Sequence, residues 1–173
     1  MSIEIEQDDS DELIELFEFI EHFNVHYSLL IKRYKRFREI DIISNYDIDV
    51  ITYLDIIIVQ LRAMCIESDR YKNNYVAQIL LRKVNEPELA DKLDAMLNEE
   101  FLTGITGFTI RKALKTLADG FICHCDNFDG IDGDEWVMAE IIEKQLRNPY
   151  KRINLEYIMF TLIDCIGDGL TIR

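Results

Sequence analysis

An apolar stripe near the N-terminus restricts the fold of this chain more than any other feature. Hydrophobic residues recur there at steps of three and four positions, at Leu13, Leu16, Phe17, Ile20, Phe23, Tyr27, Leu30, Ile31 and Tyr34. Because an α-helix has 3.6 residues per turn, this spacing places them on one side of a helix. Neither Gly nor Pro interrupts the chain up to Glu39, and Asp9 followed by Glu12 forms a capping box. The sequence predicts an amphipathic helix of about 45 Å, either continuous or broken at "FNVH".

A second apolar segment, Asp47–Glu67, predicts the central helix of the fold. Its sequence, "DIDVITYLDIIIVQLRAMCIE", has apolar residues on nearly every side of the helical wheel. The run "IIIV" alone would also suit a β-strand, but the spacing of Leu54, Ile58 and Leu61 favours a helix. We expect this helix to lie in the middle of a bundle.

Further helices are predicted along the rest of the chain. The predicted helices are "NYVAQILLRKV", a helix that starts at "NEPEL", the stretch from Ile110 to Cys125, "EWVMAEIIEKQL" and "NLEYIMFTLIDCI". The segments "SNYD" and "LTGITG" are predicted to be a turn and a loop. Asn85 suits the N-cap of the "NEPEL" helix, with Glu88 three positions later and Pro87 in its first turn. These segments are typical of a helical bundle with short connections.

Composition supports a single globular domain. Hydrophobic residues make up 49% of the 173 residues, and the chain holds only 7 Gly, 2 Pro and no linker-like segment. We therefore expect one all-α domain, residues 1–173, built as a bundle of six to seven helices. No apolar run approaches the ~20 residues that span a bilayer, so no membrane contact is expected. The acidic start "MSIEIEQDD" and four Cys without framework spacing predict a cytoplasmic protein with reduced thiols.

Charge is unevenly distributed along the chain. The formal net charge is −14, which repels a phosphate backbone and argues against DNA binding. Every charged residue from Glu4 to Glu21 is acidic, whereas "KRYKRFR", Lys32–Arg38, holds five bases in seven residues. These bases can form a solvated face that suits the negative end of a helix, or a local contact for an anion or RNA.

Three clusters of metal-capable residues lack the spacing of a metal site. Cys123, His124 and Cys125 are consecutive, so their side chains point in different directions and cannot converge on one zinc ion. His22 and His26 lie one helical turn apart, but "HFNVH" lacks the Glu of the zinc-protease helix and a third ligand. The loop "DNFDGIDGDE" fails the EF-hand spacing in both registers of its glycines. We expect no metal and no cofactor.

One stretch, "IRKALKTLADGFICHCDNF" (Ile110–Phe128), resembles a known family. It is similar to the signature helix of HEPN domains, especially the toxin–antitoxin and abortive-infection branch. That pattern typically has Arg, then Asn or Asp, a basic or small residue, two apolar residues, a small residue, His, any residue and Asp. In "ADGFICHCD", Asp119, His124 and Asp126 fall at the corresponding positions. The resemblance implies an all-helical fold and a site at this helix.

The arginine of the HEPN pattern is absent from its expected place, four to six residues before His124. In HEPN ribonucleases a His acts on the ribose 2′-hydroxyl or the leaving oxygen, and the Arg binds the phosphate. The resemblance therefore implies an impaired catalytic site at Asp119, His124 and Asp126. Arg111 and Lys115, at least one further helical turn away, are the nearest candidates for phosphate or RNA binding. We expect binding of RNA, a nucleotide or a partner rather than cleavage, and a homodimer in which two copies of this helix form one groove.

A simpler interpretation of the same residues stays open. If the helix is regular to residue 125, His124 lies near Phe121 at the edge of the apolar face, as an ordinary core histidine. Asp119 can pair with Lys115, four residues back, and Asp126 can start a turn. The chain would then be a non-catalytic interaction or immunity-like protein, whose acidic surface binds a basic partner.

Overall fold

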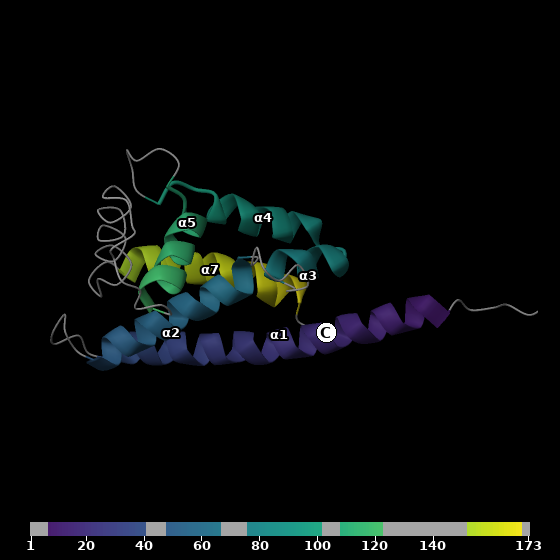
Figure 1. Ribbon diagram of the computed structural model, residues 1–173, viewed down its shortest axis with the longest axis horizontal. Helices are drawn as coiled ribbons and strands as arrows, with labels where there is room; N and C mark the ends of the chain where they lie inside the picture. Colours follow the sequence, from purple (N-terminus) through teal and green to yellow (C-terminus); the bar gives the residue numbers. More distant parts are fainter. Residues whose placement is uncertain (1–6, 41–47, 67–75, 102–107, 123–151, 171–173) are drawn as a thin grey trace, which may run out of the picture.

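The computed structural model describes residues 7–40, 48–66, 76–101, 108–122 and 152–170. Within these ranges the chain forms six α-helices and one π-helix, arranged as a bundle (Figure 1). The strand-type pairing in this part of the chain is one isolated bridge between Glu100 and Thr109. The predicted all-α fold is therefore confirmed. The predicted helix "EWVMAEIIEKQL" and the segments "SNYD" and "LTGITG" lie outside the described residues.

The first helix, α1 (Gln7–Glu39), is one continuous helix of 33 residues, so the alternative of a break at "FNVH" is wrong. It begins at Gln7, before Asp9, so Asp9 does not precede the helix, although the predicted capping box requires that position. One side of α1, including Phe23 and Leu30, is buried where the helix contacts α2. Figure 1 shows the N-terminal part of α1 running past α3 and α7.

The second helix, α2 (Ile48–Cys65), lies antiparallel to α1 and occupies the centre of the bundle (Figure 1). It contacts α1, α3, α5 and the π-helix. Its fully buried residues recur at steps of three and four and lie on one side of the helix: Val50, Leu54, Ile57, Ile58, Leu61, Met64 and Cys65. Asp49, Thr52 and Ala63 are exposed on the opposite side. The predicted central position agrees with the packing of α2 on these other helices, but the prediction that nearly every side is buried is wrong.

The turn between α3 (Ala77–Lys83) and α4 (Pro87–Leu97) differs from the sequence prediction. Asn85 is not the N-cap of α4. It has a φ of 65° and ends α3 in the left-handed conformation, which Asn adopts more readily than most residues. The Glu86 amide donates to the Leu81 carbonyl at 2.8 Å and closes this end of α3. Glu86 takes the N-cap position, and Pro87 opens α4 as predicted.

The last described helix, α7 (Arg152–Gly169), packs on α3 and α4. A Cβ atom added to Gly169 would collide with the Leu81 side chain and lie 3.0 Å from Leu89 Cδ1. The absence of a side chain therefore lets the end of α7 approach α3 and α4 closely. Buried side chains from every described α-helix join one hydrophobic core, which continues into the π-helix through Leu117.

Candidate functional site

The stretch that resembles HEPN domains begins as α5 (Ile110–Lys115) and continues as a π-helix, η1 (Thr116–Ile122). Thr109 caps α5, because its hydroxyl accepts a hydrogen bond from the Lys112 amide at 3.2 Å. The premise of a regular α-helix to residue 125 is therefore wrong at Thr116–Ile122, the last residues of this stretch that the structure describes. The wider turn of a π-helix changes which residues share a face, and such turns are frequent at functional sites.

Asp119, on η1, is paired with an arginine that the sequence analysis did not consider. Arg62 of α2 donates from Nε to Asp119 Oδ1 and from Nη2 to Oδ2, both at 3.1 Å. A third donor, Arg62 Nη1, binds the carbonyl of Ile66 at 2.8 Å. The Arg62 side chain is only 15% exposed, whereas that of Asp119 is 45% exposed. The carboxylate therefore covers a buried guanidinium at the surface of η1.

A sequence signal for Arg62 exists, although its partner is 57 positions away. Arg62 is the only Lys or Arg in α2, the helix predicted to be buried on nearly all sides. A cation in such a helix needs a charged or hydrogen-bonding partner, since its desolvation is costly. The signal indicates that a partner is needed, but it does not say which of the 33 acidic residues provides it.

Four further residues of the predicted site remain: Arg111, Lys115, His124 and Asp126. Arg111 Nη2 binds Asp94 Oδ1 at 2.8 Å, so its cation contacts α4 and not Asp119. Lys115 is the last residue of α5 and is partly buried. His124 and Asp126 lie outside the described residues.

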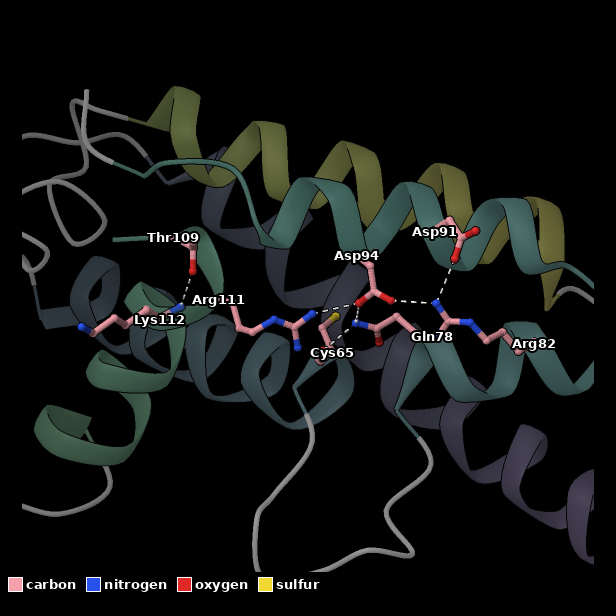
Figure 2. Close-up of polar contacts among 8 residues, drawn as sticks. All are labelled: Cys65, Gln78, Arg82, Asp91, Asp94, Thr109, Arg111 and Lys112. Atoms are coloured by element: carbon pink, nitrogen blue, oxygen red, sulfur yellow. Dashed lines mark hydrogen bonds and ion pairs between the residues drawn. The ribbon is translucent and has the colours of Figure 1, made fainter. Parts of the chain in front are cut away.

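Asp94 is the centre of a cluster of polar contacts that joins several helices (Figure 2). Its Oδ1 accepts hydrogen bonds from Arg111 and, at 3.2 Å, from Gln78 Nε2, and its Oδ2 accepts from Arg82 at 2.8 Å. Gln78, buried on α3, also donates to the Cys65 carbonyl at 2.9 Å. The carboxylate thus joins α3, α4 and α5 and, through Gln78, reaches the end of α2.

Three ionisable groups at this cluster, Asp94, Cys65 and Arg82, have shifted pKa values. Hydrogen bonds to Asp94 and Asp91 raise the pKa of Arg82. Burial by itself raises the pKa of Asp94, but hydrogen bonds from Arg82 and Gln78, together with Arg111, outweigh burial and lower it. Burial raises the pKa of the Cys65 thiol to about 12, despite the opposing charge of Arg111. Asp94 therefore stays ionised and Cys65 stays a neutral thiol near neutral pH, which is the pattern of a structural cluster.

A small pocket of about 240 Å³ lies between α1 and α2. It is lined by Phe19, His22, Phe23, His26, Gln60, Ala63 and Met64. The Nε2 atoms of His22 and His26 are 3.1 Å apart, close to the spacing of two nitrogens bound to one zinc ion at ~2.0–2.1 Å. Within the described ranges, however, no group of three or more His, Cys, Asp or Glu can hold a metal ion.

Comparison of the chain with family models, with curated proteins and with solved structures gave no match. In the part of the chain that the structure describes, no helix is long and apolar enough to cross a lipid bilayer.

Proposed function

We propose that this chain is a cytoplasmic HEPN-like protein of the toxin–antitoxin or phage-defence type, acting as a homodimer. Its RNase site is impaired, so that it binds RNA, a nucleotide or a partner instead of cleaving RNA. The observation that supports this proposal most is the arginine beside the HEPN-like stretch. Arg62 is present there, but its Nε, Nη1 and Nη2 atoms all donate to protein oxygens.

The pairing of Arg62 explains why an arginine near this stretch does not imply cleavage. A guanidinium stabilises a phosphate when its planar donors are free to bind two oxygens at once. Asp119 takes that bidentate position, so an RNA phosphate has to displace a carboxylate to reach it. The π-helix that carries Asp119 also supports a functional role for the stretch.

RNA binding and cleavage by the purified protein test the proposal. We expect no cleavage by the wild-type chain or by His124→Ala, and measurable RNA binding. Asp119→Ala should increase RNA affinity severalfold, because it frees Arg62, and adding Arg62→Ala should remove that increase. The control is Asp91→Ala, which makes the same change in net charge at an exposed residue of α4 and should leave affinity nearly unchanged.

Two results contradict the proposal in different ways. Cleavage by the wild-type chain that is lost in His124→Ala would show that the RNase site is intact. No RNA or nucleotide binding by the wild-type chain or Asp119→Ala would remove the nucleic-acid part of the proposal.

A second candidate is an acidic interaction or immunity-like protein that binds a basic partner, as a mimic of nucleic acid. It is favoured by the net charge of −14 and by the exposed Glu12, Glu15, Glu18 and Glu21 on α1. None of these four residues forms an ion pair with another described residue. Co-purification with a basic protein, lost at high salt, would favour this function, whereas RNA bound near η1 would favour the first.

A further inference from the structure

Most of the exposed large hydrophobic residues described in this protein belong to one helix. Five of the eight lie on α1, and they are Leu13, Ile14, Phe17, Val25 and Leu29. Their exposed fractions range from 39% to 59%, although the opposite side of the same helix packs on α2. Exposed apolar residues that gather on one element indicate an interaction surface, whereas scattered ones are ordinary.

Two of these exposed residues, Ile14 and Val25, belong to a second stripe, which we call the outward face of α1. Leu13 and Phe17 belong instead to the first stripe and are exposed near the start of the helix. The members of the outward face recur at alternating steps of four and three positions: Ile14, Glu18, Glu21, Val25, Ser28, Lys32 and Lys35. All seven are exposed, and Leu29 lies beside them. The mean step of 3.5 keeps these residues in line along the helix, so a second helix could contact all of them, mainly through charged side chains. A shallow hollow on this face is lined by Glu21, Asn24, Val25, Ser28, Leu29 and Lys32.

Charge divides the outward face into two halves. Glu18 and Glu21 lie on the N-terminal side of Val25, and Lys32 and Lys35 lie on its C-terminal side. None of the four forms an ion pair with another described residue. Glu18 and Lys32 are equally far from Val25 along the helix. A helix that runs antiparallel through the same centre therefore presents Lys32 to Glu18 and Glu18 to Lys32.

We propose that the outward face of α1 binds the same face of a second copy of this chain, antiparallel and centred on Val25. The apolar centre pairs with itself, and each acidic half meets the basic half of the other copy. This contact is isologous, so two copies satisfy it and the assembly closes as a dimer. It gives the homodimer a different interface from the groove between two copies of the HEPN-like helix that the resemblance implies. The inference names a surface away from η1 and does not depend on the RNA function proposed above.

The charge pattern favours an antiparallel copy of the chain over a parallel copy and over a nucleic acid. A parallel copy would place Glu18 and Glu21 against the same residues of the second copy, and like charges at this distance repel. A nucleic acid would gain contacts at Lys32 and Lys35 only, because the acidic half repels phosphates. The antiparallel copy is the arrangement in which both halves find opposite charge.

Charge reversal followed by mixing tests the arrangement, with mass measured by sedimentation or light scattering across concentrations. Variant one is Glu18→Lys with Glu21→Lys, and variant two is Lys32→Glu with Lys35→Glu. Each alone should weaken the dimer at least tenfold, because both ends of the contact become repulsive. An equimolar mixture should form heterodimers, since variant one is basic and variant two acidic along the whole face. Recovery on mixing also shows that each variant is folded.

A control and a cross-link sharpen the test. Glu86→Lys with Glu88→Lys changes the net charge by the same amount on exposed residues outside α1, and should leave the dimer constant within about twofold. In a chain with Cys123→Ser and Cys125→Ser, Val25→Cys should form a disulfide-linked dimer under oxidised glutathione. Ile14→Cys should not, because two antiparallel copies separate these residues by roughly 33 Å.

Three outcomes would overturn the proposal. The first is a wild-type chain that stays monomeric at every concentration. The second is a dimer with the same constant in all charge variants. The third is a disulfide at Ile14→Cys as efficient as that at Val25→Cys, which would indicate a parallel contact.

Discussion

Asp94 and Asp119 are both carboxylates paired with arginines from other helices, yet they are built in opposite ways. At Asp94 the acid is the less exposed partner, at 30%, while Arg82 and Arg111 are 44% and 33% exposed. At Asp119 the cation is the less exposed partner, because Arg62 is 15% exposed and Asp119 is 45% exposed. The comparison shows what each removal leaves behind. Loss of Asp94 takes one acceptor from a buried amide and from each of two partly exposed cations, whereas loss of Asp119 leaves one mostly buried cation without its carboxylate.

Removal of Asp94 should have the largest effect on stability. Asp94→Ala leaves the buried amide of Gln78 without one acceptor, and it removes the contact of α4 with Arg111 and one of its two contacts with Arg82. We expect a loss of about 2 kcal/mol in the free energy of unfolding, measured by urea denaturation. Asp91→Ala removes a single contact to Arg82 from a residue that is 74% exposed, and should cost less than about 0.5 kcal/mol. Equal losses in the two variants would show that Asp94 is not the centre of the cluster.

The same carboxylate should give the protein a specific acid sensitivity. The pKa of Asp94 is lower in the folded chain than in the unfolded chain, so its contribution is present above the unfolded pKa. That contribution is lost as the pH falls through the folded pKa. Urea midpoints of the wild type and Asp94→Asn should therefore differ at pH 7 and converge below about pH 4, near and under the ordinary Asp pKa. A difference that stays constant to pH 2 would contradict this origin.

At the η1 pair the more exposed partner, Asp119, should be costlier to remove than Arg62, on a smaller scale than at Asp94. Asp119→Ala leaves the less exposed guanidinium of Arg62 without its carboxylate, and we expect a cost of about 1 kcal/mol. Arg62→Met leaves an exposed carboxylate that water can solvate, so its cost should be lower, under about 0.5 kcal/mol. Thermal or urea unfolding of the two variants and of the double variant measures the order and the coupling. A larger cost for Arg62→Met would mean that the burial of Arg62 is not what matters.

The sequence allowed the elements of this fold to be predicted, because local periodicity determines them. The continuous stripe of α1 and the apolar wheel of α2 both depend on spacing within one helix. Asn85 was placed wrongly because Asn suits both an N-cap and the left-handed end of a helix, and α3 and α4 are so close that either role is consistent with the sequence.

The candidate site was less accessible from the sequence, because its contacts join helices. Helix periodicity offers Lys115, four residues away, as one possible partner of Asp119, whereas the hydrogen bonds of Asp119 go to Arg62 across the bundle. The π-helix at Thr116–Ile122 has no known residue spacing that would predict it, so the face of Asp119 was misjudged. Arg111 was assigned to phosphate, but its nearest carboxylate, on Asp94, depends on how α4 packs beside α5.

Arg111 of α5 and Asp119 of η1 lie on one continuous segment, so both carboxylate pairs involve it. A smaller expected effect on stability comes from a change at the start of this segment, Thr109. Thr109→Ala removes the hydroxyl that accepts from the Lys112 amide, and should cost about 0.5–1 kcal/mol. Thr109→Ser keeps the hydroxyl and should cost less. Because α5 contacts both α2 and α4, hydrogen exchange should rise first at the amides of α5, before any change at the α3–α4 turn. If exchange rises equally throughout the protein, α5 and η1 do not open as a separate unit, and the two pairs then belong to one cooperative structure.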